Sequence, residues 1–283
     1  MNGTLYLCPT PIGNLSDISE RVVSTLKEAD LIAAEDTRNS MKLMNAFDIH
    51  VPMTSYHEYN KTQKAYTLID KLKEGKNIAL ITDAGTPGIS DPGEVLVRMC
   101  REEGISVTSL PGPCACIVAL TLSGISTRRF CFEGFLPSEK KERREILEDL
   151  KDEYRTIIIY EAPHHLKNTL SDLKEVLGGE RRIAICRELT KRFEETLLMT
   201  MEEATDHYEK NEPKGEYVLV AEGLDRKAEK EKQKQNWMDT DINEHLQMYL
   251  DKGMDKKEAM KAVAGDRGIS KSDVYKALID NTR

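Results

Sequence analysis

The stretch DAGTPGISDPG, residues 83–93, follows a short apolar run at residues 78–82 and is the best guide to the fold. Open α/β sheets bind ligands at glycine- and proline-rich loops after parallel strands, because small residues let a ligand approach the backbone. Asp83 is suited to accept hydrogen bonds from ribose hydroxyls or to attract a cation; the alternative is a turn-forming role. Asp91 precedes Pro92 and Glu94 and is predicted to cap a helix that begins at Pro92.

Around this stretch, strand-length apolar runs alternate with amphipathic stretches of helix length. The runs of the first half lie at 5–7, 31–34, 78–81 and 107–110. This alternation is typical of βαβ units and a largely parallel sheet, with a first helix predicted over 17–28 and capped by Asp17. The runs of the second half lie at 130–132, 156–160, 183–186, 197–200 and 217–220, with clear helical stretches only at 140–152 and 165–177. The second half is therefore predicted to form a mixed sheet.

Two further turns rich in glycine and proline end strands of the first predicted sheet, CPTPIGNL at 8–15 and PGPCA at 111–115. Because the carboxyl ends of parallel strands meet at one edge of a sheet, we expect the three loops to form one ligand site. The chain has neither a GxxxxGKS/T loop nor a GxGxxG fingerprint, which argues against a phosphate-centred cofactor.

The composition is that of a globular protein. Of 283 residues, 39% are hydrophobic and 32% charged, and the net charge of −8 argues against nucleic-acid binding through bulk charge alone. No apolar run approaches the ~18 residues of a membrane span, and no signal peptide is visible, so a cytoplasmic location is expected. The six cysteines lie singly among apolar residues and are expected to be reduced; no cluster has metal-site spacing, so no metal is expected.

The domain plan expected from these patterns has four parts. They are an α/β domain carrying the ligand loops (1–122), a second α/β domain that closes the cleft (123–223), a charged linker or solvated helix (224–236) and a helical C-terminal domain (237–283). In the last part, apolar residues at helical spacing are interrupted by Gly253 and Gly268, which predicts three short helices resembling a helix-turn-helix.

Nine motifs in order carry a resemblance to a known family. They are CPTPIGNLSDIS (8–19), AEDTR (34–38), SYHEYN (55–60), DAGTPGISDPG (83–93), PGPCA (111–115), FCFEGFLP (130–137), EAPHH (161–165), RELTK (187–191) and GEYVLV (215–220). Together they resemble the tetrapyrrole methylase superfamily, and within it the branch that methylates the 2′-oxygen of a decoding-centre cytidine in 16S ribosomal RNA. Gly88, Tyr59 and His165 depart from the residues common in that branch, and the last departure weakens any basic role at its position.

The resemblance implies a class III methyltransferase fold, a homodimer, 16S rRNA or the small ribosomal subunit as partner, and S-adenosyl-L-methionine (SAM) as cofactor in the cleft. The residues that it places on the cofactor are Pro11, Ile12, Gly13, Asp83, Gly85, Thr86, Cys114, Ala115, Pro163, Leu189 and Tyr217.

Methyl transfer to a ribose hydroxyl is an in-line displacement that needs a group to take up or stabilise the hydroxyl proton. The polar groups expected near the cleft are Glu35, Asp36, Arg38, His57, Glu58, Glu161, Glu188 and Lys191. Glu188 and Lys191 are candidates for base and oxyanion stabiliser, and a surface ion pair is the alternative. Asp36 and Arg38 are candidates for positioning the substrate, and a structural salt bridge is equally consistent with their spacing.

RNA binding requires local positive charge, because the chain as a whole is acidic. The basic residues expected to contact RNA phosphates are Arg128, Arg129, Lys140, Lys141, Arg143 and Arg144, with 181–182 and 191–192 as further basic pairs. A solvated helix face is the alternative at 140–144. Two other functions remain open on the sequence: methylation of a porphyrinoid precursor, and a ligand-sensing regulator whose C-terminal helices bind DNA.

Overall fold

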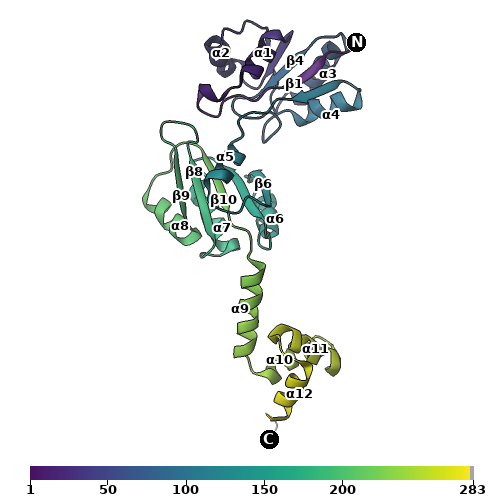
Figure 1. Cartoon of the computed structure of the whole chain (residues 1–283), viewed down its shortest axis with the longest axis vertical. Helices are drawn as coiled ribbons and strands as arrows, with labels where there is room; N and C mark the ends of the chain where they lie inside the picture. The colour runs from purple at the N-terminus through teal and green to yellow at the C-terminus, as the bar shows by residue number, and fades with distance from the viewer. Residues whose placement is uncertain (281–283) are drawn as a thin grey trace. The chain divides into compact units, whose positions relative to one another are not determined.

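The computed structural model describes residues 1–280, apart from the side chains at 229, 232, 233 and 280. The chain divides between Gly223 and Leu224 into two compact units (Figure 1). In the described part of the chain, no helix combines the length and apolar character needed to span a bilayer.

The first sheet of the larger unit is fully parallel. Its strands are β1 (Thr4–Leu7), β2 (Leu31–Ala34), β3 (Met53–Ser55), β4 (Ile78–Ile81) and β5 (Ser106–Ser109), in the order β3-β2-β4-β1-β5. Leu5 of β1 lies opposite Ile78 on one side and Val107 on the other. The alternation of apolar runs and helical stretches thus correctly predicted this sheet.

Helices cover both faces of the first sheet, because alternate residues of its buried strands point to opposite faces. The helices are α1 (Glu20–Glu28), α2 (Thr37–Ala46), α3 (Lys61–Lys73) and α4 (Glu94–Glu102). Ile32 and Ala79 pack with α1 and α2 in one core cluster, whereas Ala33 and Leu80 pack with α3 and α4 in another.

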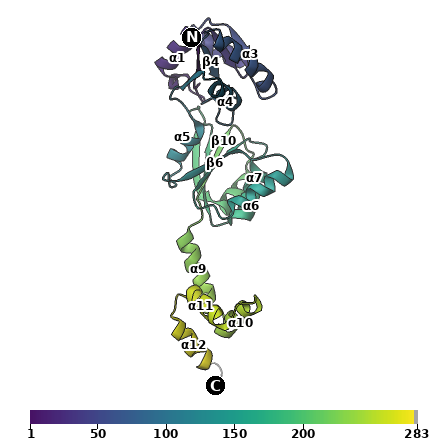
Figure 2. The same cartoon turned by 90° about the vertical axis from the view of Figure 1, so that its right-hand side faces the viewer.

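The second sheet is mixed, as predicted. Its strands are β6 (Phe130–Phe135), β7 (Thr156–Glu161), β8 (Arg182–Arg187), β9 (Glu195–Thr200) and β10 (Tyr217–Ala221), in the order β6-β7-β10-β8-β9. The β6–β7 pair is parallel and the other pairs are antiparallel. On one face lies α5 (Ala115–Leu122); on the other lie α6 (Lys140–Leu150), α7 (Leu166–Leu177) and α8 (Met201–Lys210) (Figure 2).

The C-terminal unit is helical. It consists of α9 (Arg226–Asp239), α10 (Ile242–Asp251), α11 (Lys256–Arg267) and α12 (Lys271–Asp280). Gly253 and Gly268 follow α10 and α11 with φ values of 84° and 62°, the left-handed conformation that ends a helix. The charged stretch after residue 224 is a helix, α9, that contacts α11.

Three local predictions were wrong or incomplete. Asp17 ends a short 3₁₀ turn, and α1 begins at Glu20 with Ser19 as its cap. The edge strand β3 was missed because its three residues are only half-buried and form no apolar run. The helix α8 was missed although Thr200 and Glu203 form a complete capping box at its start.

Candidate functional site

The loops after β1 and β4 meet where the strand order of the first sheet reverses. After β1 the chain continues to α1 on one face, and after β4 it continues to α4 on the other. The amides of Thr10 and Gly85 each donate to the other's carbonyl, at 2.9 and 3.0 Å, so a two-residue bridge joins the loops. Open α/β sheets bind ligands at such a reversal.

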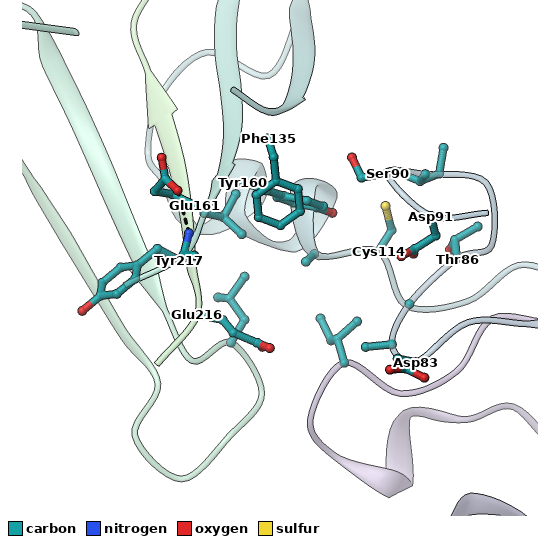
Figure 3. A pocket seen from close by; sticks show the side chains of 18 of the residues that line it. Asp83, Thr86, Ser90, Asp91, Cys114, Phe135, Tyr160, Glu161, Glu216 and Tyr217 are labelled. Atoms are coloured by element: carbon teal, nitrogen blue, oxygen red, sulfur yellow. Dashed lines mark hydrogen bonds between the residues drawn. The ribbon is translucent and has the colours of Figure 1, made fainter. Parts of the chain in front are cut away.

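A pocket of about 500 Å³ opens at this place. Figure 3 shows Thr86, Asp91 and Cys114 on one side of it and Glu161 and Glu216 on the other, with the rings of Phe135 and Tyr160 between. The lining residues are Ile12, Glu35, Asp83, Ala84, Gly85, Thr86, Ile89, Ser90, Asp91, Cys114, Ala115, Phe135, Tyr160, Glu161, Ala162, Pro163, Leu189, Glu216, Tyr217 and Val218. Residues of both sheets therefore build one cavity of a size that holds a small ligand.

The lining includes nine of the eleven residues expected to bind the cofactor. Pro11 and Gly13 are the exceptions. Their turn packs against the loop after β8: a Cβ on Gly13 would lie 2.5 Å from Cγ of Lys191 and 2.8 Å from Oγ1 of Thr190. Gly13 therefore allows two loops to approach each other, and only Ile12 of this turn reaches the pocket.

Asp91 lines the pocket and does not cap a helix, contrary to the prediction. The helix α4 begins at Glu94 with Gly93 before it. The loop first turns back on itself, since Ser90 has a φ of 61° and a Cβ on Gly93 would lie 3.0 Å from the amide nitrogen of Gly88. This turn places the Asp91 side chain among the lining residues.

Carboxyl groups dominate the polar lining. Glu35, Asp83, Asp91, Glu161 and Glu216 all contribute, whereas no lysine, arginine or histidine of the described residues lines the pocket. Burial, with the carboxylates of Glu35 and Asp83 nearby, raises the pKa of Asp91 to about 7, against the pull of a hydrogen bond from Thr82. Burial likewise raises the pKa of Glu35. The pocket therefore favours a ligand that carries positive charge.

Asp83 ties the loop after β4 to the start of α2. Its two carboxylate oxygens accept hydrogen bonds from the Asp36 amide at 3.3 Å and from Nδ2 of Asn39 at 3.2 Å. The amide of Asp83 in turn donates to Oε2 of Glu35 at 3.4 Å. Asp83 thus lines the pocket and also fixes the shape of its acidic wall.

Cys114 stands at the start of α5 beside a second thiol. The sulfurs of Cys114 and Cys116 lie 3.3 Å apart, and the Cys116 amide donates to the Tyr160 hydroxyl at 3.0 Å. The hydrogen bond from the Cys116 thiol, helped by the first amides of α5, lowers the pKa of Cys114 and raises that of Cys116.

We expect iodoacetamide at neutral pH to alkylate Cys114 before the other cysteines, because the thiolate is the reactive form. Cys131 is the internal control, since it is also half-buried but burial raises its pKa to about 11. Mass spectrometry of quenched time points measures both rates. A faster reaction at Cys131 would contradict the lowered Cys114 pKa.

Glu188 and Lys191 are paired but do not line the pocket. Nζ of Lys191 donates to Glu188 at 2.9 Å and to Glu216 at 2.7 Å, and the Glu216 amide donates to Glu188 at 3.0 Å. Although burial acts to raise it, these partners hold the Glu188 pKa below its usual value. Glu188 and Lys191 therefore fix the position of Glu216, and of these three residues only Glu216 lines the pocket.

The Asp36–Arg38 pair also lies outside the lining. Asp36 caps α2 by accepting from the Arg38 amide at 2.8 Å, and the Arg38 guanidinium pairs with it at 2.9 Å. These hydrogen bonds lower the pKa of Asp36 to about 2. This geometry matches the structural salt bridge named as the alternative.

The six basic residues expected to contact RNA fall into two groups. Arg143 is tied to Asp172 and Thr169, each at 2.8 Å, and Arg129 donates to the Tyr154 hydroxyl at 2.6 Å while lying over its ring. Arg128, Lys140, Lys141 and Arg144 are exposed. Lys140, Arg143 and Arg144 line a second hollow, beside α6 and α7.

Sequence reasoning missed several lining residues, among them Phe135, Tyr160 and Glu216. Phe135 and Glu216 lie inside the motifs FCFEGFLP and GEYVLV, and Tyr160 directly precedes EAPHH. Their place in the sequence could have identified them. Each lies at or next to the end of a strand in the second half of the chain, close to motif residues that were already expected at the cleft.

A parallel sheet and a mixed sheet, each packed against helices, share one pocket in this α/β fold. The crystal structure of uroporphyrin-III-C-methyltransferase from Thermus thermophilus is similar, with a TM-score of 0.56 at 17% sequence identity over 78% of this chain and 94% of that one. Residues 4–205 match the tetrapyrrole (corrin/porphyrin) methylases. The chain belongs to this family and is a methyltransferase.

Two curated relatives are similar over nearly the whole chain, and both are named ribosomal RNA small subunit methyltransferase I. The protein of Halalkalibacterium halodurans is 50% identical over 96% of this chain and 93% of its own length. That of Bacillus subtilis is 47% identical over 97% and 94%, respectively. The family expected from the nine motifs is thereby confirmed.

Proposed function

We propose that this protein transfers the methyl group of SAM to the 2′-oxygen of a cytidine in the 16S rRNA of the small ribosomal subunit. The names and nearly full-length similarity of the relatives support the RNA substrate. The observation that carries the proposal in the structure is the acidic pocket at the reversal of strand order, which has no basic side chain among its described lining residues. The homodimer implied by the resemblance is part of the proposal.

The pocket residues fit SAM. The cavity of about 500 Å³ offers the Phe135 and Tyr160 rings to a flat base, and its carboxylates suit a sulfonium and an ammonium group. Gly85 has a φ of 84°, and a Cβ there would lie 3.3 Å from Ile12, so the loop presents backbone where a side chain would intrude. When bound, SAM supplies an electrophilic methyl group.

The same charges direct the RNA. Carboxylates in the pocket repel phosphate, whereas the exposed Arg128, Lys140 and Arg144 attract it. A single-stranded or flipped cytidine can present its ribose hydroxyl to the pocket while its phosphates stay outside. In the proposal, the basic residues hold the RNA backbone, and the pocket holds the cofactor and the reacting hydroxyl.

Lys191 acts in the proposal as a positioning residue for Glu216. Replacement of Lys191 by alanine frees Glu216 and leaves Glu188 without its ammonium partner. We expect kcat to fall about 10-fold and the Kd for SAM to change less than about twofold, because Lys191 holds Glu216 through its ammonium group but does not itself line the pocket. Single-turnover transfer and calorimetry measure the two quantities.

Lys73→Ala is the matched control, since Lys73 forms a surface ion pair with Glu103 where α3 and α4 end, and neither residue lines the pocket. It should leave both quantities unchanged. A Lys191→Ala protein that lost affinity for SAM and kept its rate with saturating cofactor would contradict the assigned role.

The proposed function is tested with labelled SAM and small ribosomal subunits from cells that lack this protein, with naked 16S rRNA in parallel. Label in an alkali-resistant dinucleotide containing cytidine would support transfer to a ribose oxygen. Label released as a methylated base, or no label in RNA while SAM binds, would overturn it.

A further inference from the structure

Five carboxyl groups line the pocket, and three of them share one wall. Glu35 extends from the end of β2, and Asp83 and Asp91 lie in the loop after β4, so two neighbouring loops bring three carboxyl groups to one wall. Burial, and after it the Coulomb repulsion of neighbouring carboxylates such as Asp83, raises the pKa values of Glu35 and Asp91. Such an arrangement costs free energy until positive charge enters the cavity.

SAM and its product differ in charge where these carboxyl groups lie. SAM carries a sulfonium, an ammonium and a carboxylate, so it has a net positive charge. Transfer of the methyl group converts the sulfonium to a neutral thioether, and the product S-adenosylhomocysteine has no net charge. A wall of carboxylates therefore interacts differently with the two forms.

We infer that Glu35, Asp83 and Asp91 make the pocket select SAM over S-adenosylhomocysteine by charge, and that SAM binding releases a proton from Asp91 to solvent. The inference rests on the proposed function, because that function places SAM in this pocket. Loss of the sulfonium charge on transfer then weakens binding of the product and assists its release.

The proton linkage follows from the position of Asp91. With a pKa of about 7, Asp91 is about half protonated at neutral pH. A cation within about 4–6 Å favours the charged carboxylate and lowers its pKa. A fall from about 7 to about 6 releases about 0.4 proton at pH 7 and makes SAM bind about fivefold more tightly at pH 8 than at pH 6.

Other titratable groups face the same cavity. They are Glu35, Asp83, Cys114, Tyr160, Glu161, Glu216 and Tyr217. Glu161 is held by the Ala162 amide and the Thr169 hydroxyl, and Glu216 by Lys191. The hydrogen bond from Cys116 lowers the pKa of Cys114 to about 6, close to the pKa of about 7 of Asp91. A Cys114→Ser variant separates the two.

The test is calorimetry of SAM and of S-adenosylhomocysteine with the full-length protein, at pH 6, 7 and 8, in buffers of different ionisation enthalpy. With SAM at pH 7, the unsubstituted protein and Cys114→Ser should each release about 0.4 proton more than Asp91→Asn, and this difference should be much smaller with the product. Asp91→Asn should lose this part of the release and the associated pH dependence. The ligand's own amino group is present in all three titrations, so the difference between the proteins, and not the total release, reports Asp91.

Stability provides a second readout that needs no ligand. Because the folded-state pKa of Asp91 is about 7 against an ordinary 3.8, the folded protein binds more protons than the unfolded chain between these values. Stability from this residue is therefore present at low pH and lost as pH rises through about 7. Asp91→Asn should raise Tm at pH 8 and leave it nearly unchanged at about pH 4.

The outcomes separate the inference from the proposed function. SAM binding without proton release, or equal release with both ligands, would overturn the inference and leave the function intact. No binding of SAM at any pH would overturn both. The buffer comparison on the unsubstituted protein stands even where Asp91→Asn fails to fold.

Discussion

Replacement of Asp83 by alanine should remove most of the affinity for SAM, with Kd raised about 10-fold or more. The change deletes a lining carboxylate and also the two hydrogen bonds, from the Asp36 amide and the Asn39 side chain, that tie the loop to α2. Without these hydrogen bonds the loop must become ordered when SAM binds, and this ordering reduces the free energy of binding. Calorimetry at pH 8, where Asp91 is ionised, measures the effect.

Asp83→Asn separates the loss of the carboxylate charge from the loss of the loop's hydrogen bonds, since asparagine preserves the shape of the side chain but removes its charge. We expect an intermediate affinity. Asp70→Ala on the exposed side of α3 is the control and should bind SAM as the unsubstituted protein does. Wild-type affinity in Asp83→Ala would contradict the placement of the cofactor on this loop.

The second large effect concerns stability. Tyr56 follows the edge strand β3, is fully buried, and packs with Leu68, Leu80 and Leu96 between the first sheet and α3 and α4. Its replacement by alanine leaves a cavity the size of an aromatic ring. We expect the free energy of unfolding to fall by about 3–5 kcal/mol, as for large aromatic residues in other cores.

Tyr59 is the matched control because it lies three residues further along the same motif and is 98% exposed. Tyr59→Ala should change the free energy of unfolding by less than about 0.5 kcal/mol. Urea denaturation followed by circular dichroism compares the two variants. Equal midpoints would show that the core between the sheet and these helices does not depend on Tyr56.

The alternation of apolar runs with stretches of helix length predicted the parallel sheet from sequence. The apolar runs at 5–7, 31–34 and 78–81 are strands of the parallel sheet because burial on both faces demands continuous apolar sequence. The edge strand β3 escaped this reasoning because an edge position leaves Met53–Ser55 half-buried. Predictions also failed at the starts of α1 and α4, where one turn decides where a helix begins, and at α8, a ten-residue helix whose capping box was overlooked.

The part of the site that lies in the glycine-rich loops was predictable from sequence. The residues of the glycine-rich turns that line the pocket are close in sequence, so their motifs identified them together. Asp91 was assigned to a helix cap because DPGE is a sound cap sequence, and only the turn at Ser90 redirects its side chain. Glu216 and Tyr160 reach the pocket through the pairing of β10 with β7, a long-range contact that no local pattern specifies.

Acidic and basic residues lie in different places on this protein. The chain has a net charge of −8, and its pocket is acidic, yet exposed basic residues stand near the start of α6 and before β6. The acidic pocket favours a cationic methyl donor, and the basic residues favour an RNA backbone. If the pocket and the exposed surface carried charge of the same sign, they would attract either the cationic methyl donor or the RNA backbone, but not both.

A crystal structure of the protein grown with SAM tests directly whether the acidic pocket binds the cofactor. We expect ligand density against Asp83–Thr86, Cys114 and Ala115 on one side and Tyr160–Pro163 on the other. Density for SAM in the hollow lined by Lys140, Arg143 and Arg144, with the acidic pocket free of ligand, would contradict it.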